Sequence, residues 1–120
     1  MRWDIDRDVL RGRTLGIWGL GKIGSLVAGY GAAFGMRVLV FGREGSAARA
    51  AAAGYELAPS AEALCEQADV LSLHLRLTRE TRGLVTAELL ARMKESACLV
   101  NTSRAELVAP GALVAALRAG

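Results

Sequence analysis

The chain has 120 residues, 52% of them hydrophobic and 5% aromatic, and its formal net charge is +3. This length supports one domain with a substantial core, and the many Ala, Leu and Val residues are typical of a parallel sheet covered by helices. The basic residues are scattered, no run of 18 apolar residues occurs, and the start lacks the pattern of a signal peptide. We therefore expect a cytoplasmic protein with neither nucleic acid nor a membrane as its partner.

The first predicted elements lie on either side of a glycine motif. A polar entry segment over residues 1–13, with Trp3 as an anchor, precedes a strand at 15–19 and a helix at 22–34. Between the strand and the helix stands Gly19-Leu20-Gly21-Lys22-Ile23-Gly24, which has the pattern Gly-x-Gly-x-x-Gly. A strand that leads into this pattern and a helix that follows it predict a dinucleotide site. The alternative is a glycine-rich turn without a ligand.

The three glycines of the motif have separate expected roles. Gly19 allows a sharp turn off the strand, Gly21 lets a diphosphate approach the backbone, and Gly24 lets the helix lie close to the sheet. The start of the helix offers N–H groups and the positive end of its dipole to the phosphates. Further along the helix, Gly29 and Gly31 indicate close packing against the sheet.

The remaining elements alternate between strand and helix. They are a strand at 36–41, a helix at 47–53 that ends at Gly54, a short strand at 55–57, a helix after Ser60 that ends at Gln67, a strand at 69–75, a helix at 86–93, a strand at 97–101, and a helix from Pro110 to Arg118. This alternation predicts an α/β fold with a doubly wound parallel sheet of the Rossmann type, in strand order 3-2-1-4-5.

The end of the second predicted strand bears on the choice of cofactor. An acidic residue about 20 positions past the glycines normally binds the adenosine ribose, but Gly42 stands there. The missing carboxylate removes a repulsion against a 2′-phosphate, and Arg43 supplies a forked cationic donor. We therefore predict that NADP is preferred over NAD. The alternative is that Glu44 restores NAD binding while Arg43 is merely solvated.

The two cysteines, Cys65 and Cys98, fall in a predicted helix and a predicted strand. We expect both to be buried structural residues, with a disulfide or a reactive thiol as the alternative. The sequence shows no spacing of ligands that would indicate a metal site.

Several segments in order resemble the coenzyme domain of D-isomer-specific 2-hydroxyacid dehydrogenases, and the resemblance extends from about Leu10 to Ala119. These segments are Gly12-Arg13-Thr14-Leu15-Gly16-Ile17 to Gly24, Ala33-Phe34-Gly35-Met36-Arg37-Val38, Ala68-Asp69-Val70-Leu71-Ser72-Leu73-His74, Thr78-Arg79-Glu80-Thr81-Arg82-Gly83 and Val100-Asn101-Thr102-Ser103-Arg104.

The resemblance implies hydride transfer between a nicotinamide cofactor and a small 2-hydroxy or 2-oxo acid. Arg104 occupies the position of the arginine that binds the carboxylate and carbonyl of the substrate, although an arginine taken by itself is more often solvated. The resemblance also implies cofactor contacts at Lys22, Ile23, Leu75, Thr102 and Ser103.

The only histidine, His74, is expected to be a structural residue at a strand end, because the family places its catalytic histidine further downstream. Neither Glu95 nor Glu106 is expected to replace that histidine. Two departures from the family pattern lie near the expected site: Arg76 stands where proline is usual, and Ala105 stands where glycine is common.

We expect residues 1–120 to form a partial dinucleotide-binding domain, truncated before its last strands and without the substrate domain. Such a chain is expected to show no turnover alone. In the family, coenzyme domains commonly form a dimer contact, so a homodimer is expected for the parent protein. The alternative function is a non-catalytic nucleotide sensor or scaffold, as in some corepressors related to this family.

Overall fold

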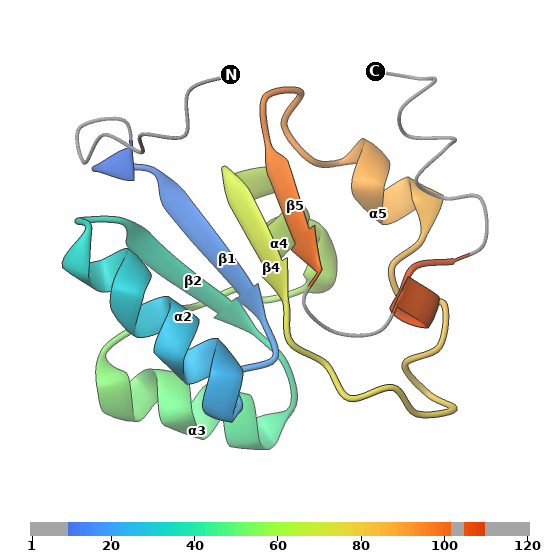
Figure 1. Ribbon diagram of the computed structural model, residues 1–120, viewed down its shortest axis with the longest axis horizontal. Coiled ribbons are helices and arrows are strands. Elements are labelled where there is room, and N and C mark those ends of the chain that lie inside the picture. The colour runs from blue at the N-terminus through green and yellow to red at the C-terminus, as the bar shows by residue number, and fades with distance from the viewer. Residues whose placement is uncertain (1–9, 102–104, 110–120) are drawn as a thin grey trace.

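The computed structural model describes residues 10–101 and 105–109, which form a five-stranded parallel sheet between two layers of helices (Figure 1). The strand order is β3-β2-β1-β4-β5, which confirms the predicted topology. In chain order the elements are β1 (Thr14–Trp18), α2 (Lys22–Ala33), β2 (Arg37–Phe41), α3 (Glu44–Ala53), β3 (Glu56–Leu57), α4 (Ala61–Gln67), β4 (Val70–Leu73), α5 (Ala87–Ala91), β5 (Cys98–Asn101) and a 3-10 turn (Ala105–Leu107).

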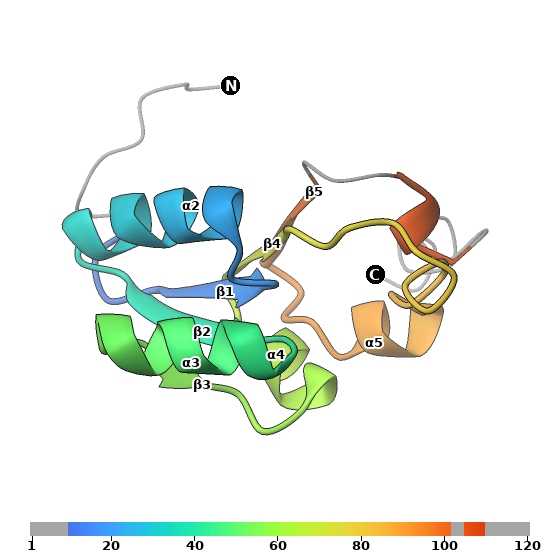
Figure 2. The same ribbon diagram turned by 90° about the horizontal axis from the view of Figure 1, so that it is seen from below.

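Helices lie on both faces of the sheet (Figure 2). Each face has its own hydrophobic core. Along β1, Leu15 and Ile17 pack into the core beneath α2 and α3, whereas Trp18 packs into the core beneath α4 and α5. This alternation follows from the two-residue period of a strand. The connections change face between β1 and β4, so the crevice where such sheets bind ligands lies at the carboxyl ends of these two strands.

Helix α3 begins at Glu44, three residues earlier than predicted. Arg43 has extended backbone angles and is the residue that precedes the first turn, while Glu44 places a carboxylate near the positive end of the helix dipole. The helix ends at Gly54, whose φ of 80° confirms the predicted glycine cap. Ser60 is likewise confirmed as a cap, because its Oγ accepts a hydrogen bond from Ala63 N at 3.1 Å.

The predicted roles of four other residues have different outcomes. A Cβ on Gly31 would meet the Leu15 side chain, as close packing requires, but one on Gly29 would meet nothing within 4 Å, so that prediction was wrong for Gly29. Cys65 is buried, whereas Cys98 is exposed, which corrects the prediction that both are buried. Cys98 is the first residue of β5, and this strand pairs with β4 at one end of the sheet order, where cover is incomplete. Both cysteines are free thiols.

Trp3 and the helix predicted at 110–118 lie outside the described residues. None of the helices in the described part of the chain has the length and apolar character needed to span a bilayer.

The amino ends of the central strands are joined through Asp69. Its carboxylate accepts a hydrogen bond from Thr14 N at 2.7 Å and pairs with Lys94 Nζ at 3.0 Å. The hydrogen bond from Thr14 N is the main cause that lowers the pKa of Asp69, and Lys94 adds to it. The Asp69 side chain is only 15% exposed, so solvent weakens its hydrogen bond from Thr14 N less than the ion pair with Lys94, which is 44% exposed.

We expect Asp69→Asn to lower the free energy of unfolding at pH 7 by about 1–2 kcal/mol. A carboxyl whose pKa is depressed in the folded state stabilises the fold above its unfolded pKa of about 3.9, and this contribution is lost as the pH falls through the folded value. Urea unfolding of both proteins between pH 7 and pH 3 should therefore show the difference shrinking below about pH 4. A difference independent of pH would contradict this account.

Candidate functional site

The turn between β1 and α2 requires two of its three glycines for the chain's own packing. Gly19 has a φ of 97°, and a Cβ on it would lie 2.7 Å from the His74 carbonyl oxygen. A Cβ on Gly24 would overlap the carbonyl oxygen of Gly19. A Cβ on Gly21, in contrast, would meet nothing within 4 Å. The chain itself therefore gives no steric reason for glycine at position 21, and the open space beside it suits an approaching ligand.

The start of α2 is suited to an anion. Gly21 is its N-cap and provides no side-chain acceptor, and the first turn holds no acidic residue. The first N–H groups of this 12-residue helix, including those of Lys22 and Ile23, therefore lack the usual side-chain cap. Together with the helix dipole, they would hold the diphosphate of a dinucleotide.

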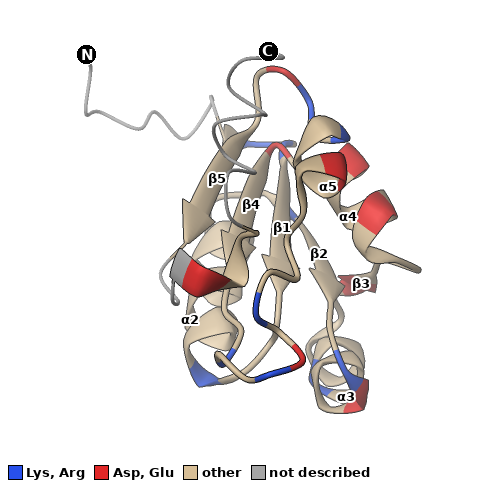
Figure 3. Ribbon diagram, turned by 90° about the vertical axis from the view of Figure 1, so that its right-hand side faces the viewer, with Lys and Arg blue, Asp and Glu red and all other residues tan. Residues whose placement is uncertain are grey.

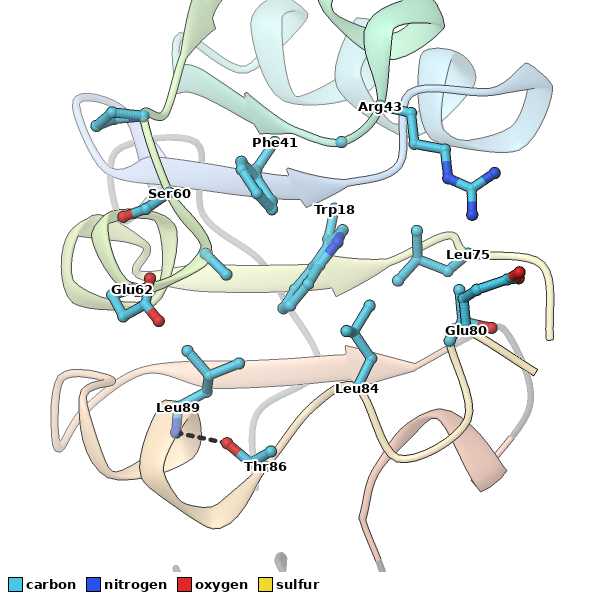
Figure 4. A pocket seen from close by; sticks show the side chains of 14 residues that line it. Trp18, Phe41, Arg43, Ser60, Glu62, Leu75, Glu80, Leu84, Thr86 and Leu89 are labelled. Atoms are coloured by element: carbon cyan, nitrogen blue, oxygen red, sulfur yellow. Dashed lines mark hydrogen bonds between the residues drawn. The ribbon is translucent and has the colours of Figure 1, made fainter. Parts of the chain in front are cut away.

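A cavity of about 710 Å³ opens beside this turn, on the face of the sheet that α4 and α5 cover (Figure 4). The aromatic side chains of Trp18 and Phe41 form an apolar floor. Their rings meet edge to face, with centroids 5.6 Å apart. The residues that line it are Trp18, Phe41, Gly42, Arg43, Pro59, Ser60, Ala61, Glu62, Leu75, Glu80, Thr81, Leu84, Thr86 and Leu89.

The glycine turn and the cavity are parts of one surface. Gly42, which lines the cavity, lies so near the turn that a Cβ on it would be 3.6 Å from Gly19 Cα. The side chain of Leu75 would be 3.1 Å from a Cβ on Gly19. The structure thus brings Gly42, Arg43 and Leu75 together with the motif at 19–24, at the carboxyl ends of β1, β2 and β4. Thr102, Ser103 and Arg104 lie outside the described residues.

Position 42 has no space for an acidic side chain in the present packing. A Cβ on Gly42 would lie 2.7 Å from Ser46 Oγ and 2.8 Å from Ser46 Cβ, so a larger residue would require Ser46 to move. The exposed side chain of Arg43 extends from the end of β2 toward Leu75 (Figure 4). Glu44 is exposed and does not line the cavity.

His74 supports the turn and does not line the cavity. Its backbone N–H donates to Trp18 O at 2.9 Å, and its ring Nε2 lies 2.7 Å from Ser72 Oγ. Burial lowers the pKa of His74, which favours the neutral ring. This geometry agrees with the structural role expected for His74.

Sequence reasoning missed most of the cavity wall and two residues that contact the glycine turn. Trp18 directly precedes Gly19, and this position could have indicated its place beneath the turn. Ser46 and Arg49 contact Leu20 from α3, but they are 26 and 29 residues away in an Ala-rich segment that gives no such signal. In the described part of the chain, no group of three or more His, Cys, Asp or Glu side chains could hold a metal ion.

Comparison with known proteins gives consistent matches. Residues 2–120 match the family described as "D-isomer specific 2-hydroxyacid dehydrogenase, NAD binding domain". Over 111 residues the chain is 50% identical to a glyoxylate reductase of Aeropyrum pernix, and over 109 residues it is 45% identical to a D-3-phosphoglycerate dehydrogenase of Mycobacterium leprae. These alignments cover 92% and 91% of this chain but 33% and 20% of the two relatives.

Solved structures agree with the sequence matches. A putative D-3-phosphoglycerate dehydrogenase from Ralstonia solanacearum superposes with a TM-score of 0.91 at 62% identity, covering 93% of this chain and 33% of that one. A D-lactate dehydrogenase from Escherichia coli gives a TM-score of 0.83 at 37% identity, covering 92% and 35%. The chain therefore spans between a fifth and about a third of the length of these relatives.

Proposed function

The chain belongs to the D-isomer-specific 2-hydroxyacid dehydrogenase family, whose NAD-binding domain it matches. We propose that it binds NADP(H) in preference to NAD(H). The bound nicotinamide would give or accept a hydride in a reaction on a small 2-hydroxy or 2-oxo acid. The residues of this chain would hold the diphosphate at the start of α2 and the adenosine in the adjoining cavity.

The observation that carries the NADP(H) preference is the end of β2. Gly42 leaves no carboxylate for the ribose hydroxyls, Ser46 fills the space beside it, and Arg43 reaches over the cavity with a group that matches a phosphate. Titration with NADPH and NADH, followed by protein fluorescence, tests the proposal directly. Tighter binding of NADH would refute the preference, and binding of neither would refute the site.

Arg104 follows β5 in the Asn-x-x-Arg segment and would bind the substrate, while Thr102 and Ser103 would contact the cofactor. An arginine there would bind a carboxylate through two parallel hydrogen bonds. In a protein that reduces a 2-oxo acid, Arg104→Lys should lower kcat/KM about a hundredfold, because lysine cannot reproduce the paired contact.

The control for Arg104→Lys is the affinity for NADPH, which should stay within about twofold of the unchanged protein. Loss of cofactor binding in parallel with activity would contradict a role for Arg104 in substrate binding.

We propose that the 120-residue chain does not turn over by itself. Its only histidine, His74, supports the glycine turn through its backbone, and its ring Nε2 is engaged with Ser72 Oγ at 2.7 Å, as a structural residue requires. Measurable reduction of glyoxylate or hydroxypyruvate by the purified chain would overturn this. Firm cofactor binding by a longer protein that reduces no 2-oxo acid in a panel would favour the sensor or scaffold function instead.

The homodimer is also part of the proposal, and the surface of α2 supports it. The helix carries charge only at Lys22 (Figure 3), and four large apolar side chains on it and at its end are exposed: Ile23, Leu26, Tyr30 and Phe34. Light scattering on the purified protein should give the mass of two chains, and Tyr30→Glu should reduce it to one. A single-chain mass before substitution would contradict the dimer.

The free thiols agree with a cytoplasmic location, which we also propose.

A further inference from the structure

Helix α3 holds the middle residue of the glycine turn by both of its backbone polar groups. Leu20 N donates a buried hydrogen bond to Ser46 Oγ at 2.9 Å, and Leu20 O accepts one from Arg49 Nη1 at 3.0 Å. The Leu20 side chain is 1% exposed and packs into the core beneath α2 and α3. Leu20 is therefore anchored to α3 through its main chain and its side chain together.

These two hydrogen bonds determine the orientation of two peptide planes. In a planar trans peptide the C=O and N–H groups point in opposite directions. Ser46 holds Leu20 N–H, so the carbonyl of Gly19 points away from α3, toward Gly24 in the first turn of α2. Arg49 holds Leu20 C=O, so the N–H of Gly21 also points away from α3.

The turn needs this support because glycine stands on both sides of Leu20. Glycine has the widest choice of backbone angles of any residue, so a Gly-Leu-Gly segment without anchors samples many orientations of its amides. An anion site gains affinity when its donors are held in the binding orientation beforehand. Two side chains from α3 provide that restraint without occupying the ligand space.

We propose that Ser46 and Arg49 are positioning residues that hold the glycine turn in its diphosphate-binding conformation. This inference rests on the proposed cofactor site and assigns two further residues a role in it. Helix α3 begins beside Arg43, at the ribose end of that site, and its next turns reach the diphosphate end. The same helix thus ties the two phosphate-binding regions of the site together.

A direct contact of Arg49 with a 2′-phosphate is the competing explanation. Arg49 does not line the cavity, and its guanidinium lies over Gly45, 3.3 Å from where a Cβ on that glycine would stand, with Nη1 on Leu20 O. This placement directs the cation at the turn. Arg43, in contrast, lines the cavity.

Three ligands separate these explanations: ADP-ribose, which carries the diphosphate, adenosine 2′-phosphate, which carries only the 2′-phosphate, and NADPH, which carries both. We expect Ser46→Ala and Arg49→Met to weaken NADPH and ADP-ribose about tenfold and to leave adenosine 2′-phosphate within twofold. Arg49→Lys should recover part of the loss. The matched control is Arg92→Met, an exposed arginine on the end of α5 that pairs with Glu66 and should change none of the three affinities.

Other patterns overturn the proposal. Equal weakening of all three ligands would mean a general loss of stability, and selective weakening of the two ligands with a 2′-phosphate would make Arg49 a direct ligand. Hydrogen exchange without nucleotide gives an independent readout, since Ser46→Ala should speed exchange of the Leu20 amide at least about tenfold and leave the β1 amides unchanged. Unchanged Leu20 exchange refutes the anchor itself. If Ser46→Ala speeds Leu20 exchange as expected but the unchanged protein binds neither NADPH nor ADP-ribose, the proposed cofactor site is refuted, and the positioning role with it.

Discussion

Gly21→Ala is expected to remove binding of NADPH and NADH while the protein stays folded. A Cβ at this position meets no protein atom within 4 Å, and the extended backbone of Gly21, with its negative φ of −92°, demands no left-handed conformation of alanine. Alanine is a poorer N-cap than glycine, which costs about 1 kcal/mol or less of unfolding free energy. The added methyl group would stand where the diphosphate approaches, so both affinities should fall about a hundredfold or more.

Two other glycines provide matched controls for this variant. Gly29→Ala, on the exposed side of the same helix, should leave affinity unchanged and raise stability by about 1 kcal/mol, because its Cβ also meets nothing. Gly24→Ala should lower both stability and affinity, because its Cβ overlaps Gly19 O. Titration calorimetry and thermal unfolding of the three variants give the comparison. Wild-type affinity in Gly21→Ala would show that no ligand phosphate approaches the turn.

Arg43→Ala is expected to weaken NADPH selectively. A hydrogen bond between a guanidinium and a phosphate contributes about 1.5–3 kcal/mol, so the NADPH dissociation constant should rise about tenfold to a hundredfold. NADH lacks the 2′-phosphate and should bind within about twofold of its original affinity. The ratio of the two dissociation constants, measured by fluorescence titration, is the quantity to compare.

The control for Arg43→Ala is Arg13→Ala. This substitution removes the same charge directly before β1, at the amino ends of the strands and so at the opposite end of the sheet from the site. It should leave the ratio unchanged, because screening limits the reach of a surface charge to about 10 Å. An equal loss of NADPH and NADH in Arg43→Ala would show that Arg43 does not discriminate between the cofactors.

The topology and the glycine turn were predictable from the sequence because both depend on local patterns. Apolar strands, helix caps such as Ser60, and the spacing of Gly19, Gly21 and Gly24 suffice for the order of elements and the edge of the sheet that holds the site. The early start of α3 was missed because an arginine before a glutamate is a weak signal for a helix start.

The contacts that shape the site depend on tertiary packing and were not predictable. Ser46 and Arg49 resemble any polar residues on the surface of an Ala-rich helix until α3 is placed against the turn. Cys98 was expected to be buried because its strand is apolar, but its place at the start of the outer strand exposes it. Whether a segment forms a strand depends on its own residues, whereas the burial of that strand depends on the elements that pack around it.

The two thiols also differ enough to permit site-specific labelling. Burial, aided by Glu62 and Glu66, raises the pKa of Cys65 to about 11, so this residue presents almost no thiolate to a maleimide dye at neutral pH. Cys98 is exposed at the amino end of β5, whereas the glycine turn lies at the carboxyl ends of the strands. A fluorophore attached there would follow assembly or cofactor loading from a distance and leave the crevice clear.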